Sequence, residues 1–407
     1  MQDILVESFA LRPCSLRVAL VTETYPPEVN GVAMTLGRLV EGLVQRGHAV
    51  QVVRPRQTRE DWPRHHNGVA EVLATGVPIP KYEGLKFGLP SGRRLEALWR
   101  QHRPDIVHVA TEGPLGWSAV AAARRLKLPV TSSFHTNFHH YSQHYGLSLL
   151  KTPIDAYLRK LHNRTQATLV PTQALVEELA RKGYSNLQLM SRGVAIDQFN
   201  PLRRNPALRA AWGVSADDLV LLYVGRLAKE KNIGLALTAY ATIKAHLPSV
   251  KMVFVGDGPQ RGAIKGLCPE AIFAGMQLGD DLAAHYASAD VFLFPSLSET
   301  FGNVIPEALA SGLGVVAYAQ AAAAELINNK VNGCVAKPGD ELGFARAALE
   351  LATSRALLQH VRGHAVSSVS HMAWSSVQDA FLGTLYGVIG SFGGAFEQTH
   401  QLLVTPE

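Results

Sequence analysis

The feature that most constrains the fold is a regular alternation of short apolar runs with segments of helical periodicity. Each run is apolar almost throughout, which is typical of parallel strands that are buried on both faces. Strands that alternate with helices predict an α/β fold with doubly wound parallel sheets. The runs are residues 16–23, 48–55, 105–110, 128–135, 167–172, 219–226, 250–257, 271–276, 291–296 and 314–319.

The alternation occurs twice, before and after a segment rich in proline and arginine. A chain of 407 residues is too long for one hydrophobic core, so two domains are expected. Residues 201–206 contain two prolines and two arginines, a composition typical of an exposed linker. We therefore predict a Rossmann-like domain over residues 1–200, a second one over 201–385, and a C-terminal helix end and tail over 386–407.

Cysteine usage and the start of the chain indicate a cytoplasmic protein. The three cysteines, Cys14, Cys268 and Cys334, lie far apart with no metal-ligand or redox spacing, which suits a reducing compartment. The sequence contains no run of 18 apolar residues, and its first residues lack the pattern of a secretory signal. We expect a cytoplasmic location, with peripheral contact to the inner face of the membrane as a further hypothesis.

Charge is distributed unevenly between the two halves. Residues 1–200 hold 24 Lys and Arg against 16 Asp and Glu, a balance of +8, whereas residues 201–407 hold 15 against 17, a balance of −2. A basic half suits an anionic membrane or an acidic substrate, although scattered solvated charge is the ordinary explanation. The sequence has no zinc-finger spacing, basic helix or RNP-like strand, so nucleic acid is not an expected partner.

Two glutamates flank a loop directly after the run at 291–296. In the stretch SETFGNVIPE, Pro306 is tolerated only in a first helical turn, so a helix is expected to begin at Val304 or Ile305. The amides at Phe301 to Asn303 would then be open to a phosphate. Glu299 and Glu307 would lie on opposite sides of it, each able to accept hydrogen bonds from vicinal hydroxyls. Each glutamate alone also fits a helix or loop cap.

A cationic pair follows the run at 219–226. Gly225 and Arg226 end the run, and Lys231 comes five residues later. Arginine and lysine together can hold a diphosphate and stabilise it as a leaving group. Solvated surface charge is the alternative explanation. Position at a strand end favours a ligand site, because ligands of open α/β sheets bind there.

Two glycine motifs are less specific. Asn30-Gly31 precedes apolar residues at helical spacing, so Gly31 either lets a ligand approach a helix start or forms an ordinary turn. Gly256 and Gly258 resemble a dinucleotide loop that lacks its third glycine, and a plain strand-to-helix turn explains them equally well.

Four histidines follow the run at 128–135. His135 ends that run and is expected to face a ligand site. His139, His140 and His144 have a spacing that can bind zinc on a helix. No acid or cysteine partner is available elsewhere, so no metal site is predicted.

The blocks GRLAKEKN, VFVGDGP, ADVFLFPSLSETFGNVIPEALASG and NNKVNGCVAKPGD together resemble the retaining GT-B glycosyltransferases of family 4. The resemblance extends over essentially the whole chain, and the block from Ala289 to Gly312 is its most specific part. The segments TETYPPEVNGVAMTLGRL and SFHTNF are most similar to mannosyltransferases and to sulfoquinovosyl- or glucosyl-lipid transferases. The resemblance implies two Rossmann-like domains that face each other across a cleft.

The resemblance also implies a role for each candidate residue. Arg226 and Lys231 would bind the diphosphate, Glu299 the sugar, and His135 the donor sugar near C6, and these four are the predicted catalytic residues. Glu307 would bind the ribose hydroxyls. The remaining predicted donor-binding residues are Gly31, Gly225, Met276, Thr300, Phe301, Gly302 and Asn303, of which Met276 would meet the base through its backbone and Thr300 to Asn303 would hold the sugar and the distal phosphate.

The function implied is transfer of a hexose, with mannose from GDP-mannose as first choice, to a lipid-linked or glycan acceptor. The family retains the anomeric configuration and uses a front-side step that needs neither a carboxylate nucleophile nor a metal, and no cofactor beyond the nucleotide sugar is expected. A UDP-sugar-dependent glycolipid hexosyltransferase is the main alternative. A nucleotide-sugar epimerase, an oxidoreductase and a catalytically silent nucleotide-sugar-binding protein fit the motifs less well.

One loop of the first half suggests the acceptor. In the segment VPIPKYEGLKFGLPSGRR, residues 77–94, lysines and arginines alternate with apolar residues. Such a mixture suits a lipid interface, where apolar burial and attraction to anionic headgroups add together. An ordinary packed loop explains the segment equally well.

Overall fold

The computed structural model describes residues 15–28, 30–78, 86–135 and 151–401, with the side chains of 151 and 394–401 left out. By its internal contacts the chain forms two units. Unit 1 consists of Met1–Phe134, Lys160–Thr168 and Phe381–Glu407, and unit 2 of His135–Arg159 and Leu169–Ala380. The domain boundary predicted at residue 200 stays a prediction.

The first half of the chain supplies ten strands and five helices among the described residues. The strands are β1 (Arg17–Val21), β2 (Ala49–Pro55), β3 (His65–His66), β4 (Val69–Ala74), β5 (Gly76–Pro78), β6 (Lys86–Gly88), β7 (Ile106–Val109), β8 (Val130–Ser133), β9 (Ala167–Val170) and β10 (Leu187–Leu189). The helices are α1 (Gly31–Gln45), α2 (Gly92–Gln101), α3 (Pro114–Arg125), α5 (Lys151–His162) and α6 (Gln173–Arg181).

The second half supplies six strands. They are β11 (Val220–Val224), β12 (Lys251–Val255), β13 (Ile272–Gly275), β14 (Val291–Phe294), β15 (Gly314–Tyr318) and β16 (Cys334–Ala336). The α-helices are α7 (Pro206–Ala211), α8 (Ile233–His246), α9 (Arg261–Leu267), α10 (Gly279–Ser288), α11 (Val304–Ala310), α12 (Ala321–Leu326), α13 (Glu341–Thr353), α14 (Arg355–Val369) and α15 (Trp374–Gln401). Short 3₁₀ helices are η2 (Pro201–Arg203), η3 (Lys229–Lys231) and η4 (Ser370–Met372).

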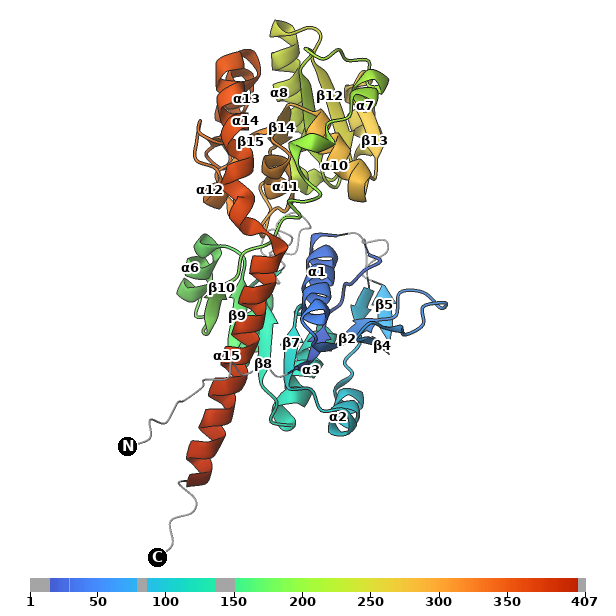
Figure 1. Cartoon of the computed structure of the whole chain (residues 1–407), viewed down its shortest axis with the longest axis vertical. Helices are drawn as coiled ribbons and strands as arrows, with labels where there is room; N and C mark the ends of the chain where they lie inside the picture. Colours follow the sequence, from blue (N-terminus) through green and yellow to red (C-terminus); the bar gives the residue numbers. More distant parts are fainter. Residues whose placement is uncertain (1–14, 29, 79–85, 136–150, 402–407) are drawn as a thin grey trace, which may run out of the picture. The chain divides into compact units, whose positions relative to one another are not determined.

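The first sheet has the strand order β10-β9-β8-β7-β1-β2-β4-β3 (Figure 1). Strands β8, β7, β1, β2 and β4 pair in parallel, and the two-residue β3 lies antiparallel to β4. Strands β7 and β8 are buried at every residue, and β1 is buried from Val18 to Val21. Burial on both faces explains why the sequence of these strands is apolar throughout.

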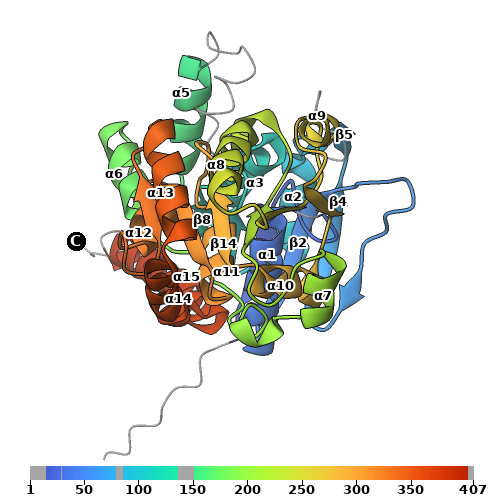
Figure 2. The ribbon, with the colours of Figure 1, turned by 90° about the horizontal axis from the view of Figure 1, so that it is seen from above.

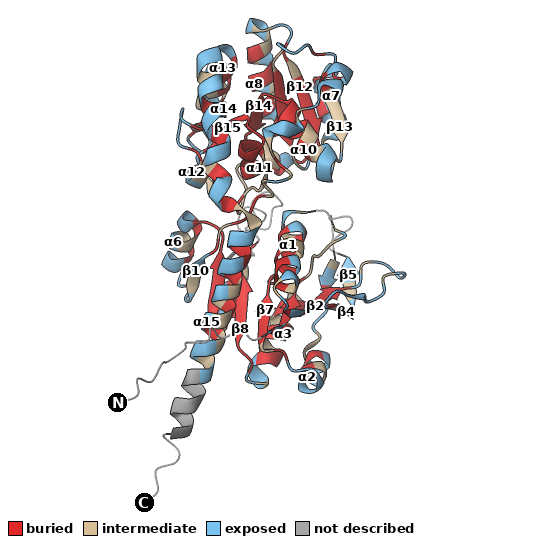
Figure 3. Cartoon of the chain, in the orientation of Figure 1, coloured by how far each residue is buried: buried red, intermediate tan, exposed pale blue. Residues whose placement is uncertain are grey.

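The second sheet is parallel throughout, in the order β13-β12-β11-β14-β15-β16. Its strands β11, β14 and β15 are buried at every residue and the edge strand β13 is half-buried, whereas the helices around the sheet carry an exposed outer face (Figure 3). Helices α8 and α13 pack side by side on this sheet (Figures 1 and 2). Because every strand points the same way, the loops that follow the strands all meet at one edge of the sheet.

Glycines allow three of these loops to join through their backbones. A Cβ at Gly256 would lie 2.1 Å from the carbonyl oxygen of Gly225, and one at Gly258 would lie 2.4 Å from that of Leu227. Leu227 N donates to Asp257 O at 2.9 Å, and Gly256 N donates to Gly275 O at 2.7 Å. The close approach of backbones explains the two glycines as parts of a strand-to-helix turn.

Ion pairs hold the segment after residue 200 against the rest of unit 2. The buried carboxylate of Asp290 pairs with Arg204 at 3.0 Å, Arg209 at 3.2 Å and Arg362 at 3.0 Å. Arg204 also donates to the carbonyl oxygens of residues 287 and 289. The expectation of an exposed linker therefore holds for Pro201 and Arg203 but is wrong for Arg204, which is half-buried.

The structure confirms the predicted α/β architecture. All ten apolar runs are strands, namely β1, β2, β7, β8, β9, β11, β12, β13, β14 and β15. Across the residues that the structure describes, no helix is both long enough and apolar enough to cross a membrane.

Candidate functional site

Lys231 and Glu299 meet at the carboxyl edge of the second sheet. Lys231 ends η3 after β11, and Glu299 lies in the loop after β14, which is the strand next to β11. The ammonium donates to Glu299 Oε1 at 2.5 Å, and the Ser296 hydroxyl donates to the same oxygen at 2.7 Å. Both charged side chains retain some exposure, 18% for Lys231 and 15% for Glu299. The pair is thus fixed in position and still reachable from solvent.

Arg226 lies on the same loop as Lys231. Its guanidinium is 42% exposed. It lies 3.9 Å from Glu230, a buried carboxylate four residues further along the chain. The Ser298 hydroxyl donates to the carbonyl oxygen of Glu230 at 3.1 Å, which joins this loop to the one that carries Glu299. The structure therefore brings the loops of three predicted catalytic residues, Arg226, Lys231 and Glu299, together.

The loop after Glu299 presents backbone donors. Helix α11 begins at Val304, as Pro306 predicted, and Gly302 has φ +90°, a conformation that favours glycine. In the described part of the chain, no acceptor receives a hydrogen bond from the backbone N–H of Thr300, Phe301 or Gly302. The Phe301 side chain is buried in the core, so this residue contributes to a site only through its backbone.

Glu307 lies in the first turn of α11 and is held by a tyrosine that the sequence did not single out. The hydroxyl of Tyr286, a fully buried residue of α10, donates to Glu307 Oε2 at 2.9 Å. The Tyr286 ring packs edge-on against Phe199 at 5.6 Å. Burial raises the pKa of Glu307 to about 7, while the tyrosine hydrogen bond acts in the opposite direction because it favours the charged carboxylate.

Tyr286→Phe is expected to weaken binding of a donor through Glu307 while leaving the fold intact. The Tyr286 hydrogen bond lowers the pKa of Glu307. Without it this pKa rises, and the carboxylate form appears only at higher pH. GDP is the nucleotide of the donor that the resemblance implies, and its apparent dissociation constant, measured from pH 6 to 9, should therefore reach its low plateau at higher pH than in the wild type. An unchanged pH profile would contradict this role, and the melting temperature is the control for folding.

Gly225 and Met276 also lie at this edge. Gly225 directly follows β11 and has φ +148°, and Met276 directly follows β13 with 56% of its surface exposed. Gln277 Nε2 donates to the carbonyl oxygen of Ala274 at 2.7 Å, which fixes the turn around Met276. The backbone at Met276 is thus held in place while its side chain faces solvent.

In unit 1, Gly31 is the first residue of α1. Asn30 caps this helix, and its Oδ1 accepts hydrogen bonds from the amides of Val32 and Ala33. Asn30 is held in turn by Thr24, which accepts from its Nδ2 at 2.7 Å. Two first-turn amides are therefore used by the cap, and the helix start offers a ligand fewer donors than the sequence suggested.

His135 is buried and contacts an arginine. Arg192 Nη2 donates to His135 Nδ1 at 2.7 Å, and both residues belong to unit 2. A donor on Nδ1 requires that nitrogen to be unprotonated. Burial lowers the pKa of Arg192 to about 10. Arg192 is 57 positions away in sequence, and no local pattern pointed to it.

Glu23, a carboxylate that the sequence did not single out, lies just after the carboxyl end of β1. Glu23 accepts hydrogen bonds from the Thr111 hydroxyl and, at 3.2 Å, from the amide of Leu115. A Cβ at Gly113 would lie 2.1 Å from its Oε1. Burial is the main cause that raises the pKa of Glu23 to about 7. Glu23 thus joins the loop after β1 to the start of α3.

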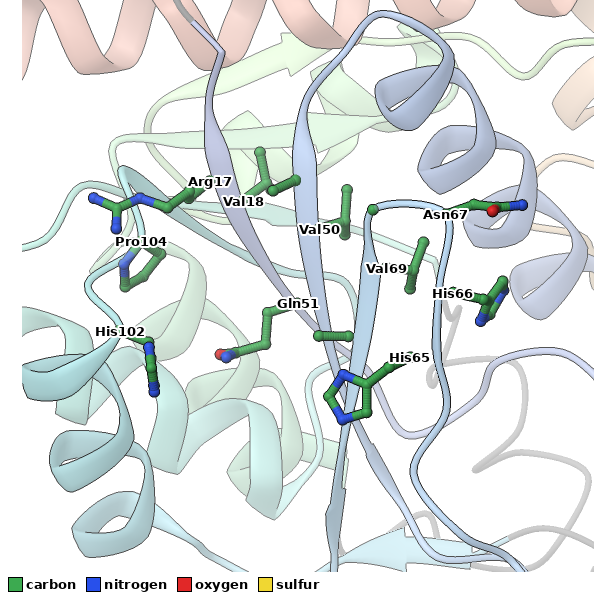
Figure 4. A pocket seen from close by; sticks show the side chains of 13 residues that line it. Arg17, Val18, Val50, Gln51, His65, His66, Asn67, Val69, His102 and Pro104 are labelled. Atoms are coloured by element: carbon green, nitrogen blue, oxygen red, sulfur yellow. The ribbon is translucent and has the colours of Figure 1, made fainter.

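A hollow on unit 1 lies at the opposite edge of its sheet. A cavity of about 430 Å³ lies at the amino ends of β1 and β2 and is lined by Gln51, His65 and His102, among others (Figure 4). It contains none of the predicted site residues. Over the described ranges, no group of three or more His, Cys, Asp or Glu is placed to hold a metal. His139, His140 and His144 lie outside the described residues.

Two curated relatives cover most of the chain. A GDP-mannose-dependent alpha-mannosyltransferase from Mycobacterium tuberculosis (strain CDC 1551 / Oshkosh) is 35% identical over 380 residues, which are 93% of this chain and 98% of that protein. An alpha-monoglucosyldiacylglycerol synthase from Streptococcus pneumoniae (strain ATCC BAA-255 / R6) is 28% identical over 333 residues, 79% of this chain and 75% of that protein.

Solved structures share the architecture. A sucrose-phosphate synthase from Thermosynechococcus elongatus superposes with a TM-score of 0.75 at 20% identity, over 92% of this chain and 99% of the other. The two parallel-sheet domains have the GT-B architecture of these structures. The family model described as Glycosyltransferase Family 4 matches residues 29–198, and that described as Glycosyl transferases group 1 matches residues 218–354. The chain belongs to glycosyltransferase family 4.

Proposed function

We propose that this glycosyltransferase moves mannose from GDP-mannose to a hydroxyl of a lipid-linked or glycan acceptor, with retention of the anomeric configuration. The observation that carries the proposal is the Lys231–Glu299 pair at the carboxyl edge of the second sheet, next to loop amides that donate to no described acceptor. The choice of donor rests on the mannosyltransferase from Mycobacterium tuberculosis, which matches nearly the whole chain.

In this proposal the cations stabilise the leaving diphosphate. Arg226 contributes a planar, partly exposed guanidinium and Lys231 a point charge, and the amides of Thr300 to Gly302 add neutral donors. Negative charge develops on the diphosphate as the sugar–oxygen bond breaks. Donors that are already fixed in place stabilise this charge without reorganisation during the reaction. The same cations make a metal unnecessary.

The carboxylates orient the donor in this proposal. Glu299 accepts hydrogen bonds from the transferred sugar, and Glu307 accepts them from the ribose hydroxyls. The acceptor hydroxyl arrives on the face that the diphosphate leaves, so the configuration is retained without a covalent intermediate. His135, with its Nδ1 accepting from Arg192, has only Nε2 to offer as a donor to a sugar hydroxyl.

The acceptor is proposed to be lipid-linked, and the protein to act at the cytoplasmic face of a membrane. Two observations support this. Residues 1–200 carry a charge balance of +8, which favours association with anionic lipid headgroups. The relative from Streptococcus pneumoniae is named for a diacylglycerol product.

A thermal-shift series tests the proposed donor. GDP and GDP-mannose are expected to raise the melting temperature, because a ligand at about 100 times its dissociation constant stabilises the native state by about 2.7 kcal/mol. UDP, UDP-glucose, UDP-galactose and UDP-N-acetylglucosamine at the same concentration serve as matched controls. A shift with UDP compounds alone would support the alternative UDP-sugar-dependent glycolipid transfer. A shift with GDP-mannose but no release of GDP with any acceptor would indicate a silent binder.

A further inference from the structure

A tryptophan on a rigidly held loop of unit 1 is exposed to solvent. Trp62 lies between β2 and β3 and is 69% exposed, whereas a tryptophan that forms part of a core is largely buried, as Trp99 is here. Leaving an indole in water forgoes much of the free energy that its burial would provide, about 25 cal/mol for each Å² of apolar surface. A single exposed apolar residue is ordinary, so what matters is whether further exposed apolar residues lie beside Trp62.

The loop is fixed by a buried ion pair directly before the tryptophan. Arg54, which is 2% exposed, donates to both oxygens of Asp61 at 2.6 and 2.8 Å and to Glu71 at 2.9 Å. Asp61 also accepts from the amide of Gln57 at 2.9 Å. The hydrogen bond from Arg54 is the main cause that lowers the pKa of Asp61 to about 2. The indole is therefore held outward by an ordered loop, which lowers the entropy lost when it binds something.

A second exposed apolar strip lies beside this loop. The amide of Arg56 donates to the carbonyl oxygen of Ala74 at 2.9 Å, and a Cβ at Gly76 would lie 2.7 Å from the Arg56 oxygen and 3.1 Å from Lys86 Cδ. Strands β5 and β6, which begin at this contact, pair antiparallel, so that Val77 is opposite Phe87.

The exposed residues of this strip are apolar. Val77, Phe87 and Leu89 are exposed large hydrophobic residues of the β5–β6 pair and its end. The pair is attached to the Trp62 loop at Arg56, so the two apolar segments are neighbours in unit 1.

Cations accompany the apolar side chains. The Arg56 guanidinium lies 5.6 Å from the centre of the Trp62 ring. Arg59 and Arg64 of the same loop are exposed, against the single exposed acid Glu60, because Asp61 is neutralised by Arg54. We call Arg56, Trp62, Val77, Lys86, Phe87 and Leu89 the Trp62 surface.

We propose that the Trp62 surface docks the protein on an anionic lipid bilayer. Indole rings prefer the headgroup level of a membrane, and neighbouring aliphatic side chains add burial at the acyl boundary. Arginine and lysine near the surface add attraction to anionic headgroups. The excess of positive charge favours such headgroups over a neutral protein partner. This proposal rests on the lipid-linked acceptor of the proposed function. The residues of the Trp62 surface would bring the protein to the membrane that contains this acceptor.

Sedimentation with vesicles tests the proposal. Wild-type protein is expected to bind vesicles of phosphatidylglycerol and phosphatidylcholine more tightly than vesicles of phosphatidylcholine alone, and less tightly as salt is raised from about 0.1 to about 1 M, where the Debye length falls from about 10 to about 3 Å. The double variant Trp62→Ala/Phe87→Ala should weaken binding by about tenfold or more. Leu202→Ala, at a 94% exposed leucine of unit 2, is the matched control and should bind like the wild type.

Two further readouts separate the possible failures. The shift of melting temperature with GDP should be equal in the wild type and the double variant. If the wild type binds vesicles but shows no nucleotide shift, the proposed function fails while the docking surface stands. Equal vesicle binding by wild type and double variant, or no binding by either, overturns the docking surface. A change in oligomeric state on substitution, without an effect on vesicle binding, would show that the surface meets another copy of the chain instead.

Discussion

Lys231→Ala is expected to lower the rate of sugar transfer by about 10²- to 10³-fold, the loss typical of removing one donor that stabilises developing charge. The Lys231 ammonium is fixed at the strand ends by its hydrogen bond to Glu299 at 2.5 Å. Its removal leaves the leaving diphosphate with less positive charge. The measurement is kcat and KM for GDP release with the acceptor that supports transfer. The loss should be mainly in kcat, because the charge to be stabilised develops in the transition state.

Lys229→Ala provides the control for this experiment. Lys229 lies on the same short helix η3 and is exposed, so its replacement changes net charge equally without touching Glu299. It should retain near-normal turnover. If Lys231→Ala keeps wild-type kcat, or if Lys229→Ala loses as much, the assignment of Lys231 to the leaving group is wrong. Equal melting temperatures for both variants would rule out unfolding as the cause.

Glu299→Ala is expected to abolish transfer to a similar extent, for two reasons that can be separated. It removes the proposed acceptor for the sugar hydroxyls, and it frees the Lys231 ammonium from Glu299, the carboxylate that Ser296 holds in place. Glu299→Gln keeps an acceptor for Ser296 but loses the charge that faces Lys231. If positioning of Lys231 dominates, the double variant Lys231→Ala/Glu299→Ala should be little worse than either single variant.

Glu270→Ala is the matched control for Glu299. Glu270 pairs with Lys244 at 2.8 Å, on an exposed part of the same unit. Such exposed pairs contribute about 0–1 kcal/mol, so this variant should transfer sugar and melt like the wild type. Substantial activity in Glu299→Ala under saturating donor would refute the role of Glu299 in the reaction.

Apolar runs predicted the strands because the sheets are buried on both faces. The six strands missed are β3, β4, β5, β6, β10 and β16, and most are two or three residues long. β4 is longer, but its sequence carries Glu71, which a strand of a buried sheet does not ordinarily contain. The structure explains this residue through Arg54, which neutralises it from β2. A buried ion pair between two strands leaves no trace in the periodicity of either one.

The contact between Lys231 and Glu299 was predictable from the strand ends. Lys231 and Glu299 were singled out because each follows an apolar run, and parallel pairing then brings them to the same edge. Tyr286 and Arg192 were missed because their roles depend on partners 21 and 57 positions away. In the sequence, neither residue is part of a motif that distinguishes it from other helix or loop residues. The capping role of Asn30 does not follow from the pair Asn30-Gly31, because the same pair is equally typical of an ordinary turn.

The backbone bonds among the loops after β11, β12 and β13 bear on how this enzyme can be altered. Leu227 donates to Asp257 and Gly256 donates to Gly275, in both cases from main chain to main chain, so these contacts between the three loops do not depend on which side chains the loops carry. The exposed side chain of Met276 can then be exchanged without disturbing the scaffold around it. A side chain at Gly256 or Gly258, in contrast, would meet the backbone of the neighbouring loop at 2.1 or 2.4 Å and push the loops apart.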